Sequence, residues 1–209
     1  MPQASDALPV VHIVDDDDSL RLGLASLLRT VGLAARTYGS TQEFLNAEQS
    51  LSPGCIVLDI RLPGANGLDF QEELVALGIH LPVVLMTGHG DIPMSVRAMK
   101  AGAVDFLAKP FRDQDMIDAV TAAIKRDHLR RANENHAGAV SDRYAALSPR
   151  EREVMALVTA GKMNKQIAAE LHLSEVTVKI HRGAAMRKMG AHSLADLVRM
   201  ADALKDKSR

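Results

Sequence analysis

The sequence predicts an α/β domain with a doubly wound, five-stranded parallel sheet, followed by a second, all-helical domain. Short apolar runs alternate with helical patterns over residues 1–127, which is typical of a parallel sheet covered by helices on both faces. From residue 147 to 209 only helical patterns occur. Residues 128–146 are polar and rich in alanine and have no apolar stripe, so we expect a helical linker there.

The predicted strands of the first domain are 10–14, 34–38, 55–58, 83–86 and 104–107. Between them, Leu20, Leu24 and Leu28 lie at helical spacing, and Ser40 with Glu43 forms a capping box. In the second domain, Ser148 begins the first helix with a capping box and a proline at the first helical position. A second helix is expected at about 164–171. The third and fourth are capped by Ser174 and Ser193, and Gly190 ends the third.

Charge is distributed unevenly along the chain. Residues 1–127 carry 10 basic and 17 acidic side chains, whereas residues 147–209 carry 12 basic and 7 acidic ones. An acidic part joined to a basic part indicates two kinds of partner, a cation or phosphoryl group for one and a polyanion for the other.

The composition also bears on location. The single cysteine, Cys55, cannot form an internal disulfide, which suits a reducing cytosol. The first residues lack a basic and apolar leader, and no stretch approaches the roughly 20 apolar residues of a membrane-spanning helix. We therefore expect a cytoplasmic protein with no membrane partner.

Acidic side chains follow two of the predicted strands. Asp15 and Asp16 come directly after the first strand and Asp59 after the third, so the parallel-sheet rule places all three at one edge of the domain. Three clustered carboxylates repel one another unless a cation joins them, and hard oxygen ligands suit Mg²⁺. Alternatively, residues 15–18 are only a solvated helix N-terminus, where acids are favoured. We prefer that interpretation for Asp17 and Asp18, but it does not explain Asp59.

Two further polar side chains are predicted at the same edge. Thr87 ends the fourth strand region and Lys109 follows the fifth. A hydroxyl and an ammonium would thus meet the three carboxylates. Such a set can hold a phosphoryl group by metal, hydrogen bond and ion pair.

This arrangement resembles the receiver domain of two-component response regulators, which has a flavodoxin-like fold. The matching segments within residues 9–127 are HIVDDDD, CIVLDIRLPGANGLD, VVLMTGHGD and AMKAGAVDFLAKPF. The resemblance implies that Asp59 is the phosphoacceptor, and that Asp16 and Asp59 bind Mg²⁺ with the Arg61 carbonyl. Asp15 would assist through water.

The same resemblance assigns roles to three other residues. Thr87 would hydrogen-bond the phosphoryl oxygens, Lys109 would pair with them, and Phe106 would be the aromatic switch residue. It also implies a cis Lys109–Pro110 bond. The phosphoryl donor would be a histidine on a cognate sensor histidine kinase. The receiver itself contributes positioning and electrostatics, so we expect a switch and not an enzyme.

The segment LSPREREVMALVTAGKMNKQIAAELHLSEVTVKIHRGAAMRKMG resembles the LuxR-type helix-turn-helix domain of NarL/FixJ response regulators, over about residues 147–205. That resemblance implies double-stranded DNA as a partner. The helical repeat of the third helix separately predicts which of its faces is buried. Val178, Ala185 and Met189 form one stripe that should pack on the other helices. The residues on the opposite face are Val176, Lys179, Ile180, Gly183 and Arg187.

An exposed face with valine, isoleucine and lysine suits a helix in the major groove, where apolar groups meet thymine methyls and Lys179 reaches a guanine edge or a phosphate. An ordinary amphipathic helix with a few exposed aliphatic side chains is the alternative. Further expected DNA contacts, mainly with phosphates, are Asn164, Lys165, Thr177, His181, Arg182 and Lys188. Gly183 and Ala184 replace longer polar side chains that are frequent in this family, which leaves the base readout open.

Together these features predict a phosphorylation-controlled, DNA-binding transcriptional regulator. We expect phosphorylation to produce a homodimer through residues 96–100 and the fifth strand, with Phe106 turning inward, and RNA polymerase is a further candidate partner. The alternatives are a phosphoryl-group sink or phosphatase, and a protein-interaction adaptor that does not act through DNA. No second base follows Asp59, because Arg61 occupies the nearby position, and this favours the switch.

Overall fold

The computed structural model describes residues 8–47, 52–88 and 92–206. The chain divides into two compact units, residues 1–130 and 131–209. Within the described ranges, no helix has the combination of length and apolar character needed to cross a membrane.

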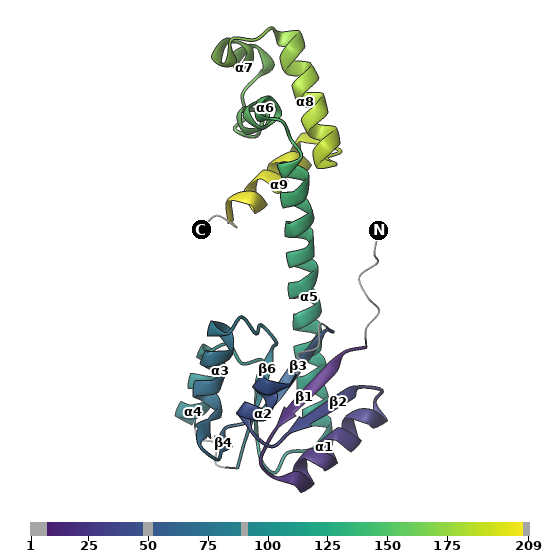
Figure 1. The fold of residues 1–209 in the computed structure, drawn as a ribbon, viewed down its shortest axis with the longest axis vertical. Helices are drawn as coiled ribbons and strands as arrows, with labels where there is room; N and C mark the ends of the chain where they lie inside the picture. Colours follow the sequence, from purple (N-terminus) through teal and green to yellow (C-terminus); the bar gives the residue numbers. More distant parts are fainter. Residues whose placement is uncertain (1–7, 48–51, 89–91, 207–209) are drawn as a thin grey trace. The chain divides into compact units, whose positions relative to one another are not determined.

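The first unit is built on a five-stranded parallel sheet with the strand order β2-β1-β3-β6-β7 (Figure 1). The strands are β1 (Val10–Val14), β2 (Ala34–Tyr38), β3 (Gly54–Asp59), β6 (Val83–Thr87) and β7 (Asp105–Ala108). Every residue of β3 and β6 is buried, as expected for strands covered on both faces. The predicted doubly wound sheet is confirmed. Its strand order reverses between β1 and β3, and ligands bind at such a point, outside the carboxyl ends of the strands.

Helices cover both faces of this sheet. They are α1 (Asp18–Thr30), α2 (Thr41–Asn46), α3 (Gly67–Ala76), α4 (Ile92–Lys100) and α5 (Asp113–Ala145). On one face, Leu28 of α1 and Val120 of α5 share a core with β1, β3 and β6. On the other face, Phe44 of α2, Phe70 of α3 and Ala98 of α4 form a second core. Residues on alternate sides of each strand therefore enter different cores.

A short antiparallel pair, β4 (Arg61–Leu62) and β5 (Ala65–Asn66), was not among the predicted elements. Gly64 turns the chain between the two strands with a φ of 75°, a conformation that favours glycine. The Pro63-Gly64 dipeptide is the local signal that could have indicated this turn. The pair leads directly from β3 into α3, whose amino end is capped by the Asn66 side chain.

Helix α5 is one continuous helix of 33 residues that includes the expected linker. The division between the units, at residue 130, falls inside it. Asp127 is buried in the first unit and Val140 in the core of the second, so α5 contributes packing on both sides of the division. Domain borders at residues 127 and 147 stay a prediction.

The second unit contains α6 (Pro149–Thr159), α7 (Asn164–Leu171), α8 (Glu175–Met189) and α9 (Leu194–Asp206). Ser148 and Glu151 form the predicted capping box, and Gly190 ends α8 with a φ of 69°. Val154, Ile167 and other apolar side chains from these helices form one core with the end of α5. The predicted second, all-helical domain is confirmed.

Candidate phosphoacceptor site and DNA-binding surface

Three aspartates converge where the strand order of the sheet reverses. Asp15 follows β1 and is fully buried, Asp59 is the last residue of β3 and is 6% exposed, and Asp16 is exposed. Ligand oxygens from the three carboxylates all lie within 4.8 Å of one another. The parallel-sheet rule therefore predicted the position of this cluster correctly.

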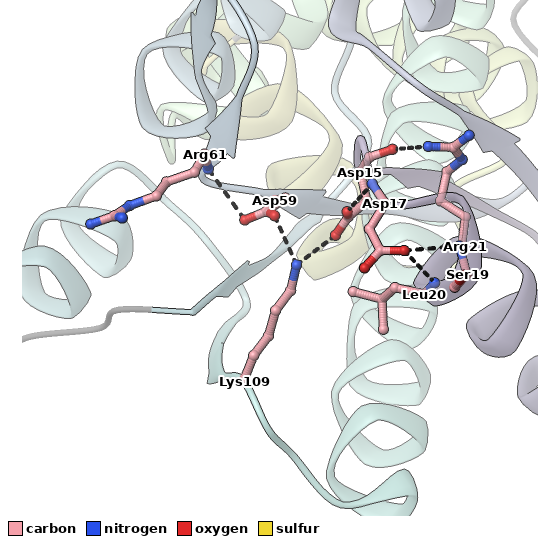
Figure 2. A network of polar contacts seen from close by, with 8 residues as sticks. All are labelled: Asp15, Asp17, Ser19, Leu20, Arg21, Asp59, Arg61 and Lys109. Atoms are coloured by element: carbon pink, nitrogen blue, oxygen red, sulfur yellow. Dashed lines mark hydrogen bonds and ion pairs between the residues drawn. The ribbon is translucent and has the colours of Figure 1, made fainter.

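Lys109 holds the two buried carboxylates together. Its Nζ donates hydrogen bonds to Asp15 Oδ2 at 2.6 Å and to Asp59 Oδ2 at 2.7 Å (Figure 2). Burial lowers the pKa of Lys109, but its hydrogen bonds to both carboxylates and their negative charges outweigh that effect, so the net pKa is raised above its ordinary value. The ammonium therefore stays charged at neutral pH.

Backbone groups bind the remaining oxygens of the same two carboxylates. The Asp17 N–H donates to Asp15 Oδ1 at 2.9 Å, and the Arg61 N–H donates to Asp59 Oδ1 at 3.2 Å. Figure 2 shows the Arg61 side chain extending away from Asp59, so the backbone of Arg61 is the part that lies beside the phosphoacceptor candidate. These bonds fix the orientation of both carboxylates.

The interpretation of Asp17 and Asp18 as acids of a helix N-terminus is confirmed. Asp17 caps α1 by accepting hydrogen bonds from the backbone of Ser19 and Leu20 at 2.9 and 3.1 Å. Arg21, which the sequence analysis did not single out, pairs with Asp18. It also donates to the Asp15 carbonyl (Figure 2). Its position three residues after Asp18 is the only local signal for this role.

The expected switch residues lie on the neighbouring strands. Thr87, the last residue of β6, is buried, and its carbonyl accepts a hydrogen bond from the Lys109 N–H at 2.7 Å. Phe106 in β7 is half-buried against the core that contains Ala98 of α4. The Lys109–Pro110 bond is cis, as predicted. The roles of Thr87 and Phe106 in switching stay predictions.

The donor set fits a hard divalent cation. Asp15, Asp16 and Asp59 offer three carboxylates to one ammonium, so the cluster has a formal net charge of −2 when all four groups are ionised. A cation bound among oxygen ligands would offset that repulsion. The acidic cluster therefore fits a divalent metal ion.

Helix α8 has one buried face and one exposed face, as the periodicity of its sequence predicted. Val178, Ala185 and Met189 are fully buried in the core of the second unit. Val176 and Ile180 are 66% and 63% exposed, and Lys179 between them is exposed. Two large aliphatic side chains thus flank a lysine on a surface that no described residue covers.

The other expected DNA contacts differ in how they are held. Arg182 donates to Asn164 Oδ1 at 3.3 Å, which links α8 to the first residue of α7. The hydroxyl of Thr177 contacts that of Ser174 at 2.8 Å. Lys188 is paired with Glu151 of the capping box at 2.7 Å. Lys188 therefore ties α8 to α6, a structural role that the sequence analysis missed.

The remaining candidates on these helices are reachable from solvent. Lys165 and Arg187 are exposed, while His181, Arg182 and Gly183 are half-buried. At Gly183 an added Cβ would meet only the Arg187 guanidinium, at 3.5 Å, so the glycine leaves the helix backbone uncovered. Their contacts with DNA stay predictions.

Comparison with known families matches both units. Residues 11–121 match the response regulator receiver domain, and residues 145–201 match the bacterial regulatory proteins of the LuxR family. Nodulation protein W of Bradyrhizobium diazoefficiens is 54% identical over 93% of this chain and 86% of its own length. The transcriptional regulatory protein FixJ of Azorhizobium caulinodans is 47% identical over 94% of this chain and 92% of its own length.

Two solved structures match most of the chain. The response regulator StyR is 44% identical with a TM-score of 0.82, covering 94% of this chain and 99% of its own. Full-length FixJ from B. japonicum is 40% identical with a TM-score of 0.57, covering 95% and 98%. An aspartate-rich receiver followed by a helix-turn-helix domain is the architecture of a response regulator. The chain belongs to the NarL/FixJ family of two-component response regulators and is a DNA-binding transcriptional regulator.

Proposed function

We propose that Asp59 accepts a phosphoryl group from a cognate sensor histidine kinase, and that this event controls DNA binding by α8. The observation that carries the proposal is the convergence of Asp15, Asp16 and Asp59 with Lys109 at the reversal of strand order. Mg²⁺ would be held by the three aspartates and the Arg61 carbonyl. The regulator would act in the cytoplasm, where it meets DNA and RNA polymerase.

The chemistry follows from the geometry around Asp59. An oxygen of the Asp59 carboxylate would attack phosphorus while the bond from phosphorus to the histidine nitrogen of the kinase breaks, and that nitrogen keeps the electron pair. Mg²⁺, when bound, would offset part of the negative charge on the transferred oxygens. The Lys109 ammonium already lies 2.7 Å from Asp59 Oδ2 and can pair with the new phosphoryl group. The Thr87 hydroxyl, at the end of the adjacent strand β6, would donate a hydrogen bond to it. Asp59 itself is oriented by the Arg61 N–H.

A dimer is the expected active form, because a single helix-turn-helix domain covers little DNA and paired half-sites need two copies. The expected dimer surface includes Val96 and Met99 of α4, which are 46% and 49% exposed. Thr87 moving towards the phosphoryl group would vacate space beside β7, and Phe106 could turn into it. This two-state element would reshape the α4 surface.

The dimer prediction can be tested with beryllofluoride, which mimics the phosphoryl group. We expect the molar mass from light scattering to double when beryllofluoride and Mg²⁺ are added to the wild type. Thr87→Ala should remain largely monomeric because the hydroxyl that senses the phosphoryl group is gone. Thr121→Ala, at an exposed position of α5, is the matched control and should dimerise normally. A wild type that stays monomeric while its DNA affinity rises would instead indicate release of a masked DNA-binding domain.

A second prediction concerns the exposed lysine of α8. Lys179→Ala should weaken DNA binding by about 1–3 kcal/mol and change the preferred base at one position if Lys179 contacts a base. Fluorescence anisotropy with a library of DNA duplexes, at several salt concentrations, measures both effects. Lys205→Ala in α9 removes the same charge from the same unit and should change affinity little. An equal loss on all sequences, with a salt slope reduced by about one, would make Lys179 a phosphate contact. Unchanged affinity would exclude it from the interface.

A further inference from the structure

The carboxyl end of α8 is held by the end of α5 (Figure 1). Arg143 of α5 donates a hydrogen bond from Nη1 to the backbone carbonyl of Met189, the last residue of α8, at 3.1 Å. Both residues belong to the second unit, but Arg143 lies before residue 145, where the match to the LuxR family begins. A segment expected to serve as a linker therefore contacts the helix that is expected to lie in the major groove.

The Met189 carbonyl is a group that the helix itself leaves without a partner. The last four carbonyls of an α-helix accept no intrahelical hydrogen bond. Backbone N–H groups of the two residues that follow α8 bind two of these carbonyls, those of Met186 and Arg187, at 2.9 and 3.1 Å. Arg143 supplies the donor for the carbonyl of Met189. Its positive charge is also favoured there, because the carboxyl end of a helix carries a partial negative charge.

Close packing brings the guanidinium to this end of the helix. Gly190 follows α8 with a φ of 69°, and a Cβ added there would lie 2.9 Å from Arg143 Nη1 and 3.4 Å from its Cζ. The absence of a side chain at residue 190 therefore lets the guanidinium approach the backbone. Val140 of α5 and Met189 are also buried in one core. The hydrogen bond, the close approach and the shared core together join the ends of the two helices.

The contacts that fix α8 lie at or beyond the middle of the helix. Lys188 ties it to α6 and Arg182 ties it to α7, and Arg143 adds the contact with α5. The exposed residues around Lys179 lie in the first half. A helix of 15 residues is about 22 Å long, so a tilt of about 5° at one end displaces the other by about 2 Å. Hydrogen bonds to base edges do not tolerate such a displacement.

We propose that Arg143 is a positioning residue for DNA recognition, which fixes the direction of α8 without itself contacting DNA. This inference rests on the proposed binding of DNA by α8. Base contacts need the helix at one place and angle in the groove, whereas long, flexible lysine and arginine side chains reach phosphates over a wider range. Loss of the Arg143 contact should therefore weaken binding to a preferred sequence more than binding to other DNA.

The test compares the full wild-type chain with Arg143→Met, which keeps an unbranched side chain but removes its charge and its donors. The probes are a duplex that the wild type selects from a random library and a scrambled duplex of equal composition. Fluorescence anisotropy at several salt concentrations measures the affinity for each. Arg143→Met should bind the selected duplex about three- to fivefold more weakly, as expected for an exposed charge at a helix end, and the scrambled duplex normally. The salt slope should stay unchanged, because no phosphate contact is lost.

The ratio of the two affinities separates positioning from stability, because a partly unfolded variant loses affinity for both duplexes by the same factor. Arg150→Met is the matched control, since Arg150 is exposed and its ion pair with Glu153 stays within α6, and it should keep the wild-type ratio.

An unchanged ratio in Arg143→Met would overturn the proposal. An equal loss on both duplexes, with a salt slope reduced by about one, would make Arg143 a phosphate contact instead. A wild type that selects no duplex from the library would contradict the binding of DNA by α8 itself, and the inference about Arg143 would fall with it.

Discussion

Asp59→Asn is expected to abolish the incorporation of phosphate from acetyl phosphate in the presence of Mg²⁺. The amide that replaces the carboxylate is a poor nucleophile, and the cluster loses one of its three negative ligands. The Lys109 ammonium, now bound to both Asp15 and Asp59, would keep only one carboxylate partner. Intact-mass spectrometry before and after incubation measures the incorporation directly. The same variant should show no increase in DNA affinity after treatment with the donor.

The control for this experiment is Asp118→Asn. Asp118 is an exposed aspartate of α5 that accepts a hydrogen bond from Gln114, so the same chemical change is made away from the cluster. This variant should be labelled like the wild type, and removal of the metal with a chelator should prevent labelling of both. Undiminished labelling of Asp59→Asn would show that another residue is the phosphoacceptor. Peptide mapping of the labelled protein would then identify it.

Gly67→Ala is expected to destabilise the first unit strongly. Gly67 is the buried first residue of α3, and a Cβ there would lie 2.4 Å from the Asp59 carbonyl oxygen and 2.8 Å from the Ile60 Cα. Both neighbours are backbone atoms of the segment that carries Asp59, the phosphoacceptor candidate, and they cannot rotate away. We expect the free energy of unfolding to fall by about 3 kcal/mol, the upper range for overpacking in a core. Urea denaturation followed by circular dichroism measures this change.

A matched glycine tests whether close packing is the cause. Gly23 lies inside α1, and an added Cβ there would meet no atom within 4 Å. Gly23→Ala should raise the free energy of unfolding by up to about 1 kcal/mol, because alanine favours a helix more than glycine does. Gly67→Ala should also reduce phosphoryl uptake at a temperature where it is still folded, since the Asp59 backbone must shift. A Gly67→Ala protein as stable as the wild type would mean that α3 moves aside easily.

Local patterns in the sequence were sufficient to predict much of the fold. The apolar runs indicated the five parallel strands, and Ser40 and Ser148 marked helix starts that the structure confirms. The convergence of Asp15 and Asp59 followed from strand order alone, because parallel strands bring their carboxyl ends to one edge. The buried stripe of α8, formed by Val178, Ala185 and Met189, followed from the helical spacing of these residues in the sequence. Each of these depends on neighbours a few residues away or on a general rule of sheet geometry.

Only the tertiary structure decided which distant side chains meet. Lys109 binds Asp15, 94 residues earlier in the chain, and this contact depends on how β1, β3, β6 and β7 pair in turn across the sheet and on the side-chain conformation of the lysine. Packing of α8 against α6 brings Lys188 to Glu151, an ion pair that the sequence did not indicate, and the phosphate contact of Lys188 stays a prediction. No periodicity encodes such contacts, because they arise from the packing of elements whose spacing in the sequence is unrelated to their spacing in the fold.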